Sequence, residues 1–206
     1  MSLRFCPLFS GSDGNCCFLE VDNKRYLIDA GFSGKKIESN LKILGIDPST
    51  IDLIFLTHEH IDHIRGAGVL SRRYDIKICS NVETLTAGAS KLGKIKDENI
   101  VVIGTEKKHR FSLFDLYTLE ISHDCARGMG FVFNTDYGKV SLLTDTGIIT
   151  NHMKDKIKGS KIFYFEANHD LDMLKNGPYD YNLKQRILGD FGHISNVTSG
   201  NVLSEV

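Results

Sequence analysis

Residues 57–63 read Thr-His-Glu-His-Ile-Asp-His and follow directly after the apolar segment Leu-Ile-Phe-Leu. Side chains alternate between two faces in an extended chain, so a buried strand that ends in a tight turn would deliver His58 and His60 on the same side. Asp62 and His63 would lie on the next turn of backbone. Two pairs of metal-binding side chains that diverge from one loop suit two neighbouring divalent ions better than one. A polar surface loop is the alternative, but clustered histidines most often bind metal.

Two further residues could bind metal where a buried strand would end. His123 follows the run Tyr-Thr-Leu-Glu-Ile-Ser, and Asp145 follows Val-Ser-Leu-Leu-Thr. An isolated His or Asp at a strand end more often caps the backbone or faces solvent. Their position alone therefore leaves both interpretations open.

The composition limits the kind of protein that this chain can be. Its 206 residues are 41% hydrophobic and 25% charged, which predicts one well-buried domain over residues 1–206. The net charge of -1 gives no global field, so affinity for nucleic acid would have to come from a local patch. The first nine residues lack the apolar core of a signal peptide, and nowhere do 18 apolar residues run together. We therefore expect a cytoplasmic protein with no membrane partner, whose oligomeric state the composition leaves open.

Hydrophobic periodicity and turn residues predict an alternating series of strands and helices. The predicted strands are residues 3–9, 16–21, 25–28, 76–79, 100–103, 113–114, 116–122, 130–134, 139–143 and 161–165. The predicted helices are one between a Ser33 cap and Gly45, then residues 66–74, 82–92 and 181–188, and a last one that Ser195 or Asn196 caps. This order favours an α/β fold of two halves packed sheet to sheet, with the helices outside.

The loop Ser10-Gly-Ser-Asp-Gly-Asn15 separates the first two predicted strands. Its residues tolerate positive φ and leave backbone amides exposed, which is what an anion-binding loop requires. Such a sequence is more often a simple turn. The residues alone leave both possibilities open.

The spacing His58-x-His60-x-Asp62-His63 after a hydrophobic strand resembles the signature of the metallo-β-lactamase superfamily. The whole chain resembles the YycJ (WalJ) group of bacterial metallo-hydrolases within it. The motifs that carry this resemblance are residues 10–15, 29–31, 33–36, 58–66, 122–124, 144–147, 165–170 and 192–196. The resemblance implies an αββα sandwich of two sheets with outer helices and a hydrolytic activity that depends on two divalent metal ions, Zn²⁺ foremost, with Mn²⁺ or Fe²⁺ as alternatives.

The resemblance also implies a role for individual residues. The first metal would be bound by His58, His60 and His123, the second by Asp62 and His63, and Asp145 would bridge the two. Asp29 would hold the ligand loop without touching metal. Two ions about 3.5–4 Å apart can share a water, lower its pKa and make hydroxide the nucleophile.

Other residues of the matching motifs are candidates for catalysis and substrate binding. The predicted catalytic residues are Asp62, His169 and His193, and the predicted phosphate-binding residues are Ser10, Ser12, Asn15, Ser195 and Asn196. His193 would be a general acid or a phosphate ligand, and His169 with Glu166 could shuttle protons. Helix caps or buried, hydrogen-bonded imidazoles are the structural alternatives for both histidines.

The favoured function is a phosphodiesterase that acts on DNA, in the manner of a 5′ to 3′ exonuclease. The phosphate preference rests on the loop 10–15, on His193 and on nearby cations, namely Lys35, Lys36, Arg65, Arg72 and Arg73. A thioester, ester or lactam hydrolase is the alternative enzyme. A metal-binding fragment with weak activity is a third possibility.

One departure from the family pattern motivates that third possibility. Relatives supply one more histidine ligand to the second metal, from a strand after the helix that follows His193. This sequence ends at Val206, inside the predicted helix. We therefore expect the last strand and helix of the family fold to be absent, and the second metal to be bound weakly unless another residue replaces the ligand.

Overall fold

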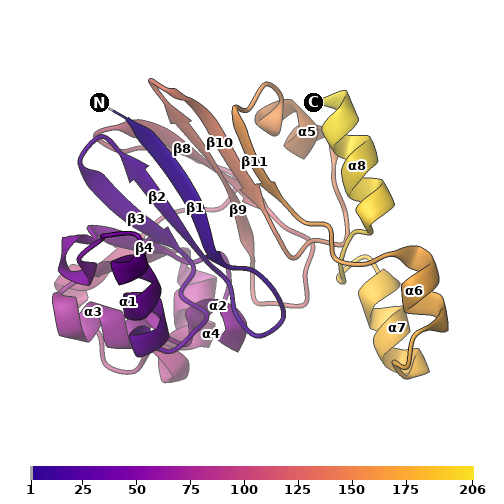
Figure 1. The fold of residues 1–206 in the computed structure, drawn as a ribbon, viewed down its shortest axis with the longest axis horizontal. Coiled ribbons are helices and arrows are strands. Elements are labelled where there is room, and N and C mark those ends of the chain that lie inside the picture. The colour runs from indigo at the N-terminus through magenta and orange to yellow at the C-terminus, as the bar shows by residue number, and fades with distance from the viewer. Residues whose placement is uncertain (1) are drawn as a thin grey trace. The chain divides into compact units, whose positions relative to one another are not determined.

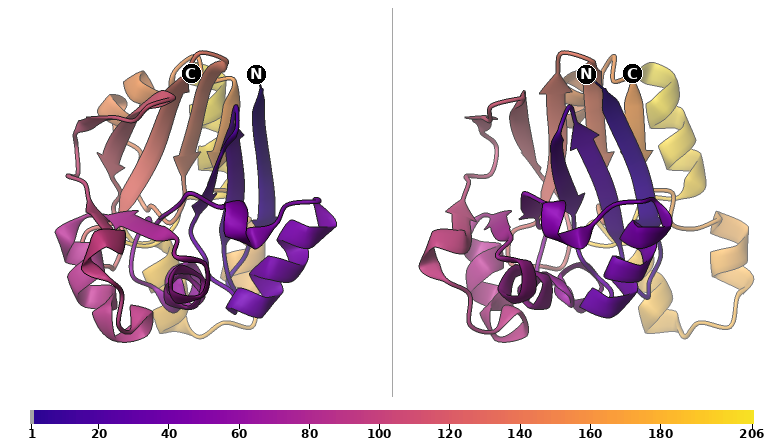
Figure 2. Two further views of the ribbon diagram at one scale, coloured as in Figure 1. Left: turned by 90° about the vertical axis from the view of Figure 1, so that its left-hand side faces the viewer. Right: turned by 60° about the vertical axis from the view of Figure 1, so that its left-hand side comes forward.

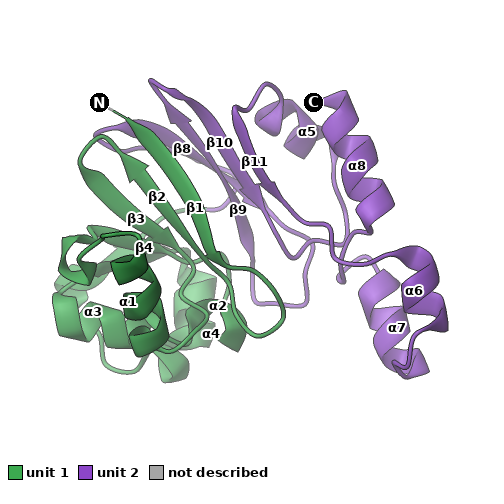
Figure 3. Cartoon of the chain, viewed as in Figure 1, with its two compact units in different colours: residues 1–104 green, residues 105–206 purple. Residues whose placement is uncertain are grey.

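A computed structural model describes residues 2–206. The chain forms two compact units, which divide between Gly104 and Thr105 and each contain one sheet (Figure 3). No helix in the described range is long and apolar enough to cross a lipid bilayer.

The sheet of the first unit has six strands in the order of the sequence (Figure 1). These are β1 (Leu3–Phe9), β2 (Cys16–Val21), β3 (Lys24–Ile28), β4 (Leu53–Phe55), β5 (Lys77–Ser80) and β6 (Ile100–Val102). β1, β2 and β3 pair antiparallel, and β3 to β6 pair parallel. In the parallel part, every strand points its carboxyl end to the same edge, where a loop can carry ligands.

Four α-helices connect these strands. They are α1 (Gly34–Ile43), α2 (Ile61–Ile64), α3 (Ala67–Tyr74) and α4 (Val82–Leu92), with short 3₁₀ turns at Pro48–Thr50 and Asp97–Asn99. Ser33 caps α1 and Asn81 caps α4, each through a hydrogen bond from a backbone amide of the first turn. Apolar side chains of all four helices pack with Phe18, Leu27 and Ile54 in one core, so the helices cover one face of the sheet.

The sheet of the second unit has five strands in the order β11-β10-β9-β8-β7. They are β7 (Lys108–Arg110), β8 (Phe114–Glu120), β9 (Met129–Thr135), β10 (Gly138–Leu143) and β11 (Ile162–Phe165). The pairs are antiparallel except for β10 with β11, which is parallel. β8 and β10 flank β9 and run in the same direction, so the residues after both lie at one edge of the sheet.

The helices of the second unit are α5 (Asn151–Ile157), α6 (Leu171–Asn176), α7 (Tyr181–Leu188) and α8 (Asn196–Glu205). Met153 and Ile157 of α5 and Val202 of α8 pack on Leu119 and Val132 of the sheet. Figure 2 shows α8 (yellow) alongside β11 (orange).

Most predicted elements are present. Residues 3–9, 16–21, 82–92 and 181–188 have the predicted bounds, and Ser195 rather than Asn196 caps the last helix. The predicted pair of strands 113–114 and 116–122 is one continuous strand, because Leu116 lies on its buried face with Phe114. The short elements α2, α5, α6 and β7 were not predicted.

Candidate metal centre

Residues 57–63 carry the predicted ligands and are called the ligand loop; this loop follows β4 and turns into α2. His58 and His63 are buried and their ring centroids lie 4.1 Å apart, while the rings of His58 and His60 are 4.6 Å apart. His60 stands at the N-cap position of α2, so Asp62 and His63 lie in its first turn. The loop therefore brings three imidazoles together at the end of a central strand.

A buried carboxylate, Asp29 at the end of β3, orients two of these imidazoles. One oxygen accepts hydrogen bonds from the amide and the hydroxyl of Thr57, at 2.8 Å and 3.0 Å. The other lies 2.7 Å from Nδ1 of His63, so His63 donates from Nδ1 and keeps Nε2 as an acceptor.

The same reasoning fixes the tautomer of His58. The Thr57 hydroxyl donates its single hydrogen to Asp29, so its oxygen accepts from Nδ1 of His58 at 3.0 Å. The acceptor of His58 is then Nε2 as well. Hydrogen bonding of one ring nitrogen to a hydroxyl or carboxylate, with the other kept for metal, is the usual arrangement of a ligating histidine.

Asp62 and Asn15 lie beside Nε2 of His63. Oδ2 of Asp62 is 3.5 Å from this nitrogen, and Nδ2 of Asn15 is 3.0 Å from it. The side-chain amide of Asn15 also forms hydrogen bonds with the backbone N–H and C=O of Gly11. The backbone amide of Asn15 donates to the Asp62 carbonyl at 2.7 Å. The loop 10–15 is thus held directly against the ligand loop.

Gly31 permits this close approach. A Cβ atom at this position would lie 1.6 Å from the carbonyl oxygen of Asp62 and 2.6 Å from the backbone nitrogen of Asn15. No side chain fits there. Glycine at the end of the segment 29–31 therefore lets three backbone segments meet behind the candidate metal-binding side chains.

In the second unit, His123, Asp145 and His193 form one group. Each offers a ligand atom, and these atoms all lie within 4.8 Å of one another. His123 follows β8 and Asp145 follows β10. Because these two strands run in the same direction, both residues lie at the same edge of the sheet. The imidazole rings of His123 and His193 are 5.1 Å apart between centroids.

Glu166 at the end of β11 holds His193 in this group. Its Oε1 lies 2.5 Å from Nδ1 of His193, and its Oε2 accepts a hydrogen bond of 2.8 Å from the amide of Thr146. Burial raises the pKa of Glu166, although these two hydrogen bonds oppose the shift. Burial disfavours the charged form of His193, but the hydrogen bond and the charge of Glu166 outweigh it and raise the pKa of this imidazole.

Two aspartates at strand ends adopt left-handed backbone conformations. Asp29 has a φ of 61° and Asp145 a φ of 52°. This region costs most L-residues roughly 1–2 kcal/mol, and Asp tolerates it better than most. Backbone conformations of this kind persist where the surrounding structure enforces them, and they cluster at functional sites.

The donors in each unit fit a divalent transition metal. Neutral imidazole nitrogens and carboxylate oxygens suit Zn²⁺, Mn²⁺ and Fe²⁺. The Asp29–Thr57 network of the first unit leaves acceptor nitrogens on two histidines, and the group in the second unit combines two imidazoles with one carboxylate.

Other predicted residues lie nearby with different contacts. His169 does not belong to the group of His123. Its backbone forms an isolated parallel β-bridge with Ser195. Burial, and after it the charge of His193, lowers the pKa of His169. Ser195 is buried and its hydroxyl caps α8, which accounts for its side chain structurally. Asn196 and the serines Ser10 and Ser12 are exposed.

Two predicted cations have structural partners. Arg72 donates to the carbonyl of Leu92 at 2.6 Å, and Arg73 forms an ion pair with Glu38. Both side chains are nevertheless exposed to solvent. That both contact phosphate stays a prediction, although each already has a partner within the protein.

Comparison with known proteins identifies the family. The model of the metallo-beta-lactamase superfamily matches residues 10–134. The chain belongs to this superfamily. It is 37% identical over 206 residues to exodeoxyribonuclease YycJ of Bacillus anthracis, covering 100% of this chain and 78% of that protein. It is 38% identical over 198 residues to exodeoxyribonuclease WalJ of Streptococcus pneumoniae, covering 95% of this chain and 74% of that protein.

Solved structures of the superfamily share the fold. A β-lactamase from Chitinophaga pinensis aligns with a TM-score of 0.60 at 14% identity, over 94% of this chain and 84% of that chain. The predicted α/β metallo-β-lactamase fold and the predicted resemblance to the YycJ (WalJ) group are confirmed. The expected enzyme class, a metal-dependent hydrolase, is confirmed with them.

Sequence reasoning missed two buried threonines of the superfamily site. The hydroxyl of Thr57 donates to the Asp29 carboxylate and accepts from Nδ1 of His58. The backbone amide of Thr146 donates to Glu166, and the hydroxyl of Thr146 accepts from the amide of Ser122. Both side chains have no exposed surface. Each lies next to a predicted ligand, and a hydroxyl beside a ligand at a strand end is the signal that could have identified them.

Proposed function

We propose that the protein is a dinuclear metal-dependent phosphodiesterase that acts on DNA. The observation that carries the proposal is the oriented histidine pair of the ligand loop, whose Nδ1 atoms are engaged by Thr57 and Asp29. The choice of DNA rests on the relatives, which are named exodeoxyribonucleases and are 37% and 38% identical over nearly the whole chain.

The proposed ligands follow the superfamily pattern. One metal is assigned to His58, His60 and His123, the other to Asp62 and His63, with Asp145 shared between them. Asp29 touches neither metal and holds the ligand loop through Thr57 and His63. When bound, two such ions supply a hydroxide nucleophile and stabilise the charge that develops on the phosphate.

His193 is proposed as the general acid. Its Nδ1 is engaged by Glu166, so Nε2 is the atom left to protonate the leaving oxygen. Glu166 favours the imidazolium form, which is the form that can give a proton. Burial lowers the pKa of His169, which favours the neutral imidazole, and a neutral imidazole can pass on a proton as a relay.

The loop 10–15 is proposed to bind substrate phosphate. Ser10 and Ser12 are exposed and Asn15 lies 3.0 Å from Nε2 of His63, so hydroxyl and amide donors adjoin the ligand loop. Asn196, exposed in the first turn of α8, is a further candidate donor.

Hydrolysis of four substrates with EDTA controls tests the function. Bis-p-nitrophenyl phosphate and 5′-phosphorylated DNA should be cleaved in the presence of Zn²⁺ or Mn²⁺, and EDTA should abolish both reactions. Faster turnover of a thioester or of nitrocefin would assign the site to acyl transfer instead. Metal binding without turnover of any substrate would contradict the proposed enzyme.

A further inference from the structure

We propose that the first unit carries a binding surface for the phosphodiester backbone of a nucleic-acid strand, beside the ligand loop. This aromatic–basic surface consists of Phe9, Phe32, Lys35, Lys36 and Arg65. The inference rests on the proposed function and specifies its substrate as a polynucleotide that extends past the scissile phosphate, rather than a small phosphodiester.

Two aromatic rings support one of the cations. Nζ of Lys36 lies 3.4 Å from the ring centroid of Phe32 and 5.0 Å from that of Phe9. The two rings are 4.4 Å apart between centroids and tilted by 50°. A cation–π contact holds an ammonium group in position but does not neutralise its charge. Lys36 is exposed, so its charge stays available to an anion from solvent.

Within the described part of the chain, the cations of this surface form no ion pair with an acidic side chain. Among residues 2–206, no carboxylate forms an ion pair with Lys35, Lys36 or Arg65, and all three side chains are exposed. Neighbouring cations of the same unit differ, since Arg73 pairs with Glu38 and Lys96 with Asp75 at 2.7 Å. These three positive charges, which no ion pair compensates, therefore suit a polyanion. The net charge of the chain, -1, would not by itself attract one.

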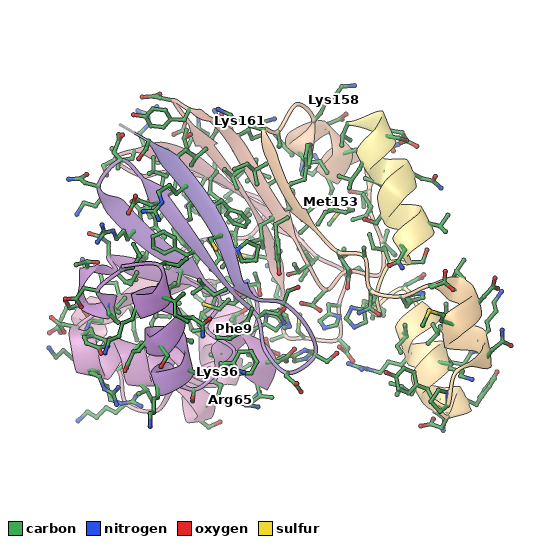
Figure 4. The ribbon with its side chains drawn as sticks, in the orientation of Figure 1. Phe9, Lys36, Arg65, Met153, Lys158 and Lys161 are labelled. Atoms are coloured by element: carbon green, nitrogen blue, oxygen red, sulfur yellow. The ribbon has the colours of Figure 1, made fainter. Side chains whose placement is uncertain are left out.

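Backbone contacts place this surface next to the metal-binding loop. A Cβ on Gly14 would lie 2.7 Å from the ring of Phe32, and a Cβ on Gly66 would lie 2.3 Å from the Phe32 carbonyl oxygen. Phe32 thus lies between the loop 10–15 and the end of α2, where Arg65 is the C-cap residue. Figure 4 shows Phe9, Lys36 and Arg65 one below another beside α1.

The chemistry of these groups matches the phosphodiester backbone of a nucleic acid. Arg65 can bind two oxygens of one phosphate, and Lys35 and Lys36 act as point charges. Each contact releases condensed counterions, so affinity should fall as the salt concentration rises. The partly buried aromatic rings fix Lys36 within this path and offer an edge to an unpaired base.

The test measures DNA affinity across a salt series. The ligand is a 5′-phosphorylated phosphorothioate oligonucleotide of about 12 nucleotides, which resists cleavage by the metal-loaded enzyme. Lys36→Ala and Arg65→Ala should each weaken binding about threefold to tenfold and reduce the slope of log affinity against log salt by about 0.7. The double variant Arg73→Ala/Glu38→Ala removes both members of an ion pair and keeps the net charge, so it should leave affinity and slope unchanged.

A second set of variants tests the support of Lys36. Phe32→Leu keeps an apolar side chain but removes the ring, so it should weaken DNA binding in the same direction as Lys36→Ala. Phe32→Tyr restores the ring and should restore affinity. Equal affinity of Phe32→Leu and wild type would show that the ring does not position the ammonium group.

Different results would contradict the aromatic–basic surface and the proposed phosphodiesterase function. In Lys36→Ala/Arg65→Ala, kcat/KM for DNA should fall at least tenfold further than kcat/KM for bis-p-nitrophenyl phosphate. Equal losses on both substrates, or an unchanged salt slope, would overturn the aromatic–basic surface while leaving the phosphodiesterase intact. If wild-type protein cleaves neither substrate, the proposed function fails, and the binding series still decides whether the surface binds DNA.

Discussion

Oε1 of Glu166 lies 2.5 Å from Nδ1 of His193, and Oε2 of the same carboxylate accepts from the amide of Thr146. Because Thr146 directly follows Asp145, one side chain couples the proposed general acid to the strand end that carries the proposed bridging ligand. The carboxylate therefore sets both the charge and the position of His193.

Glu166→Gln should lower the pKa of His193, because the substitution removes the negative charge that raises it. A general acid must be protonated, and a group with a lowered pKa loses its proton at lower pH. The alkaline limb of the kcat profile should therefore move to lower pH, measured with bis-p-nitrophenyl phosphate. An alkaline limb that keeps its position would contradict the role of Glu166.

His193→Ala is the matched control for this prediction. It should lower kcat by roughly 10² to 10⁴ and remove the alkaline limb that His193 produces. The ligand atom of His193 lies within 4.8 Å of those of His123 and Asp145, so elemental analysis must accompany the kinetics. A fall in bound metal would assign His193 as a ligand instead of an acid.

Asp145→Asn should abolish hydrolysis while leaving the fold nearly intact. The substitution removes the charge of the proposed bridge, and Asn tolerates the left-handed backbone at this position, where φ is 52°. The thermal midpoint of the metal-free variant should match that of metal-free wild type. Undiminished turnover would refute the assignment of Asp145 as a ligand.

Asp29→Asn should weaken metal binding about 10- to 100-fold, because Asp29 fixes the ring of His63 and, through Thr57, that of His58. Competition with a chromophoric chelator measures the affinity. Asp52→Asn removes a carboxylate that pairs with Lys24 away from the ligand loop, and its metal affinity should equal that of wild type. Equal affinities of both variants would show that Asp29 has no orienting role.

Much of the fold could be predicted because local pattern and final packing agree. The strand 16–21 is wholly buried and apolar except for Glu20, and α4 has a capping Asn81 and a terminal Gly93, so both have their predicted bounds. The short helices α5 and α6 have seven and six residues, too few to display a clear helical period.

The candidate site likewise has a part that the sequence could predict and a part that it could not. The spacing of His58, His60, Asp62 and His63 is local, so the sequence was sufficient to find it. The partners of Arg72 and of Arg73 are distant in sequence, at Leu92 and Glu38, and no local pattern announces them. Charge alone could not separate these arginines from the cations that remain without a carboxylate.

The last prediction concerns how many metal ions the chain binds. The proposed assignment gives one metal His58, His60, His123 and the shared Asp145, which suffices for a tetrahedral Zn²⁺ site. The other metal receives only Asp62, His63 and Asp145. We expect the first ion to survive dialysis and the second to be lost, because each protein ligand adds to affinity.

Elemental analysis of the dialysed protein should therefore find about one equivalent of metal. Activity should continue to rise as Zn²⁺ or Mn²⁺ is added well beyond one equivalent. His58→Ala should remove the retained metal, whereas Asp62→Ala should leave it and abolish the further rise in activity. Two tightly held equivalents in wild type would mean that the second metal has a ligand beyond these three, and His193→Ala would then show whether it is His193.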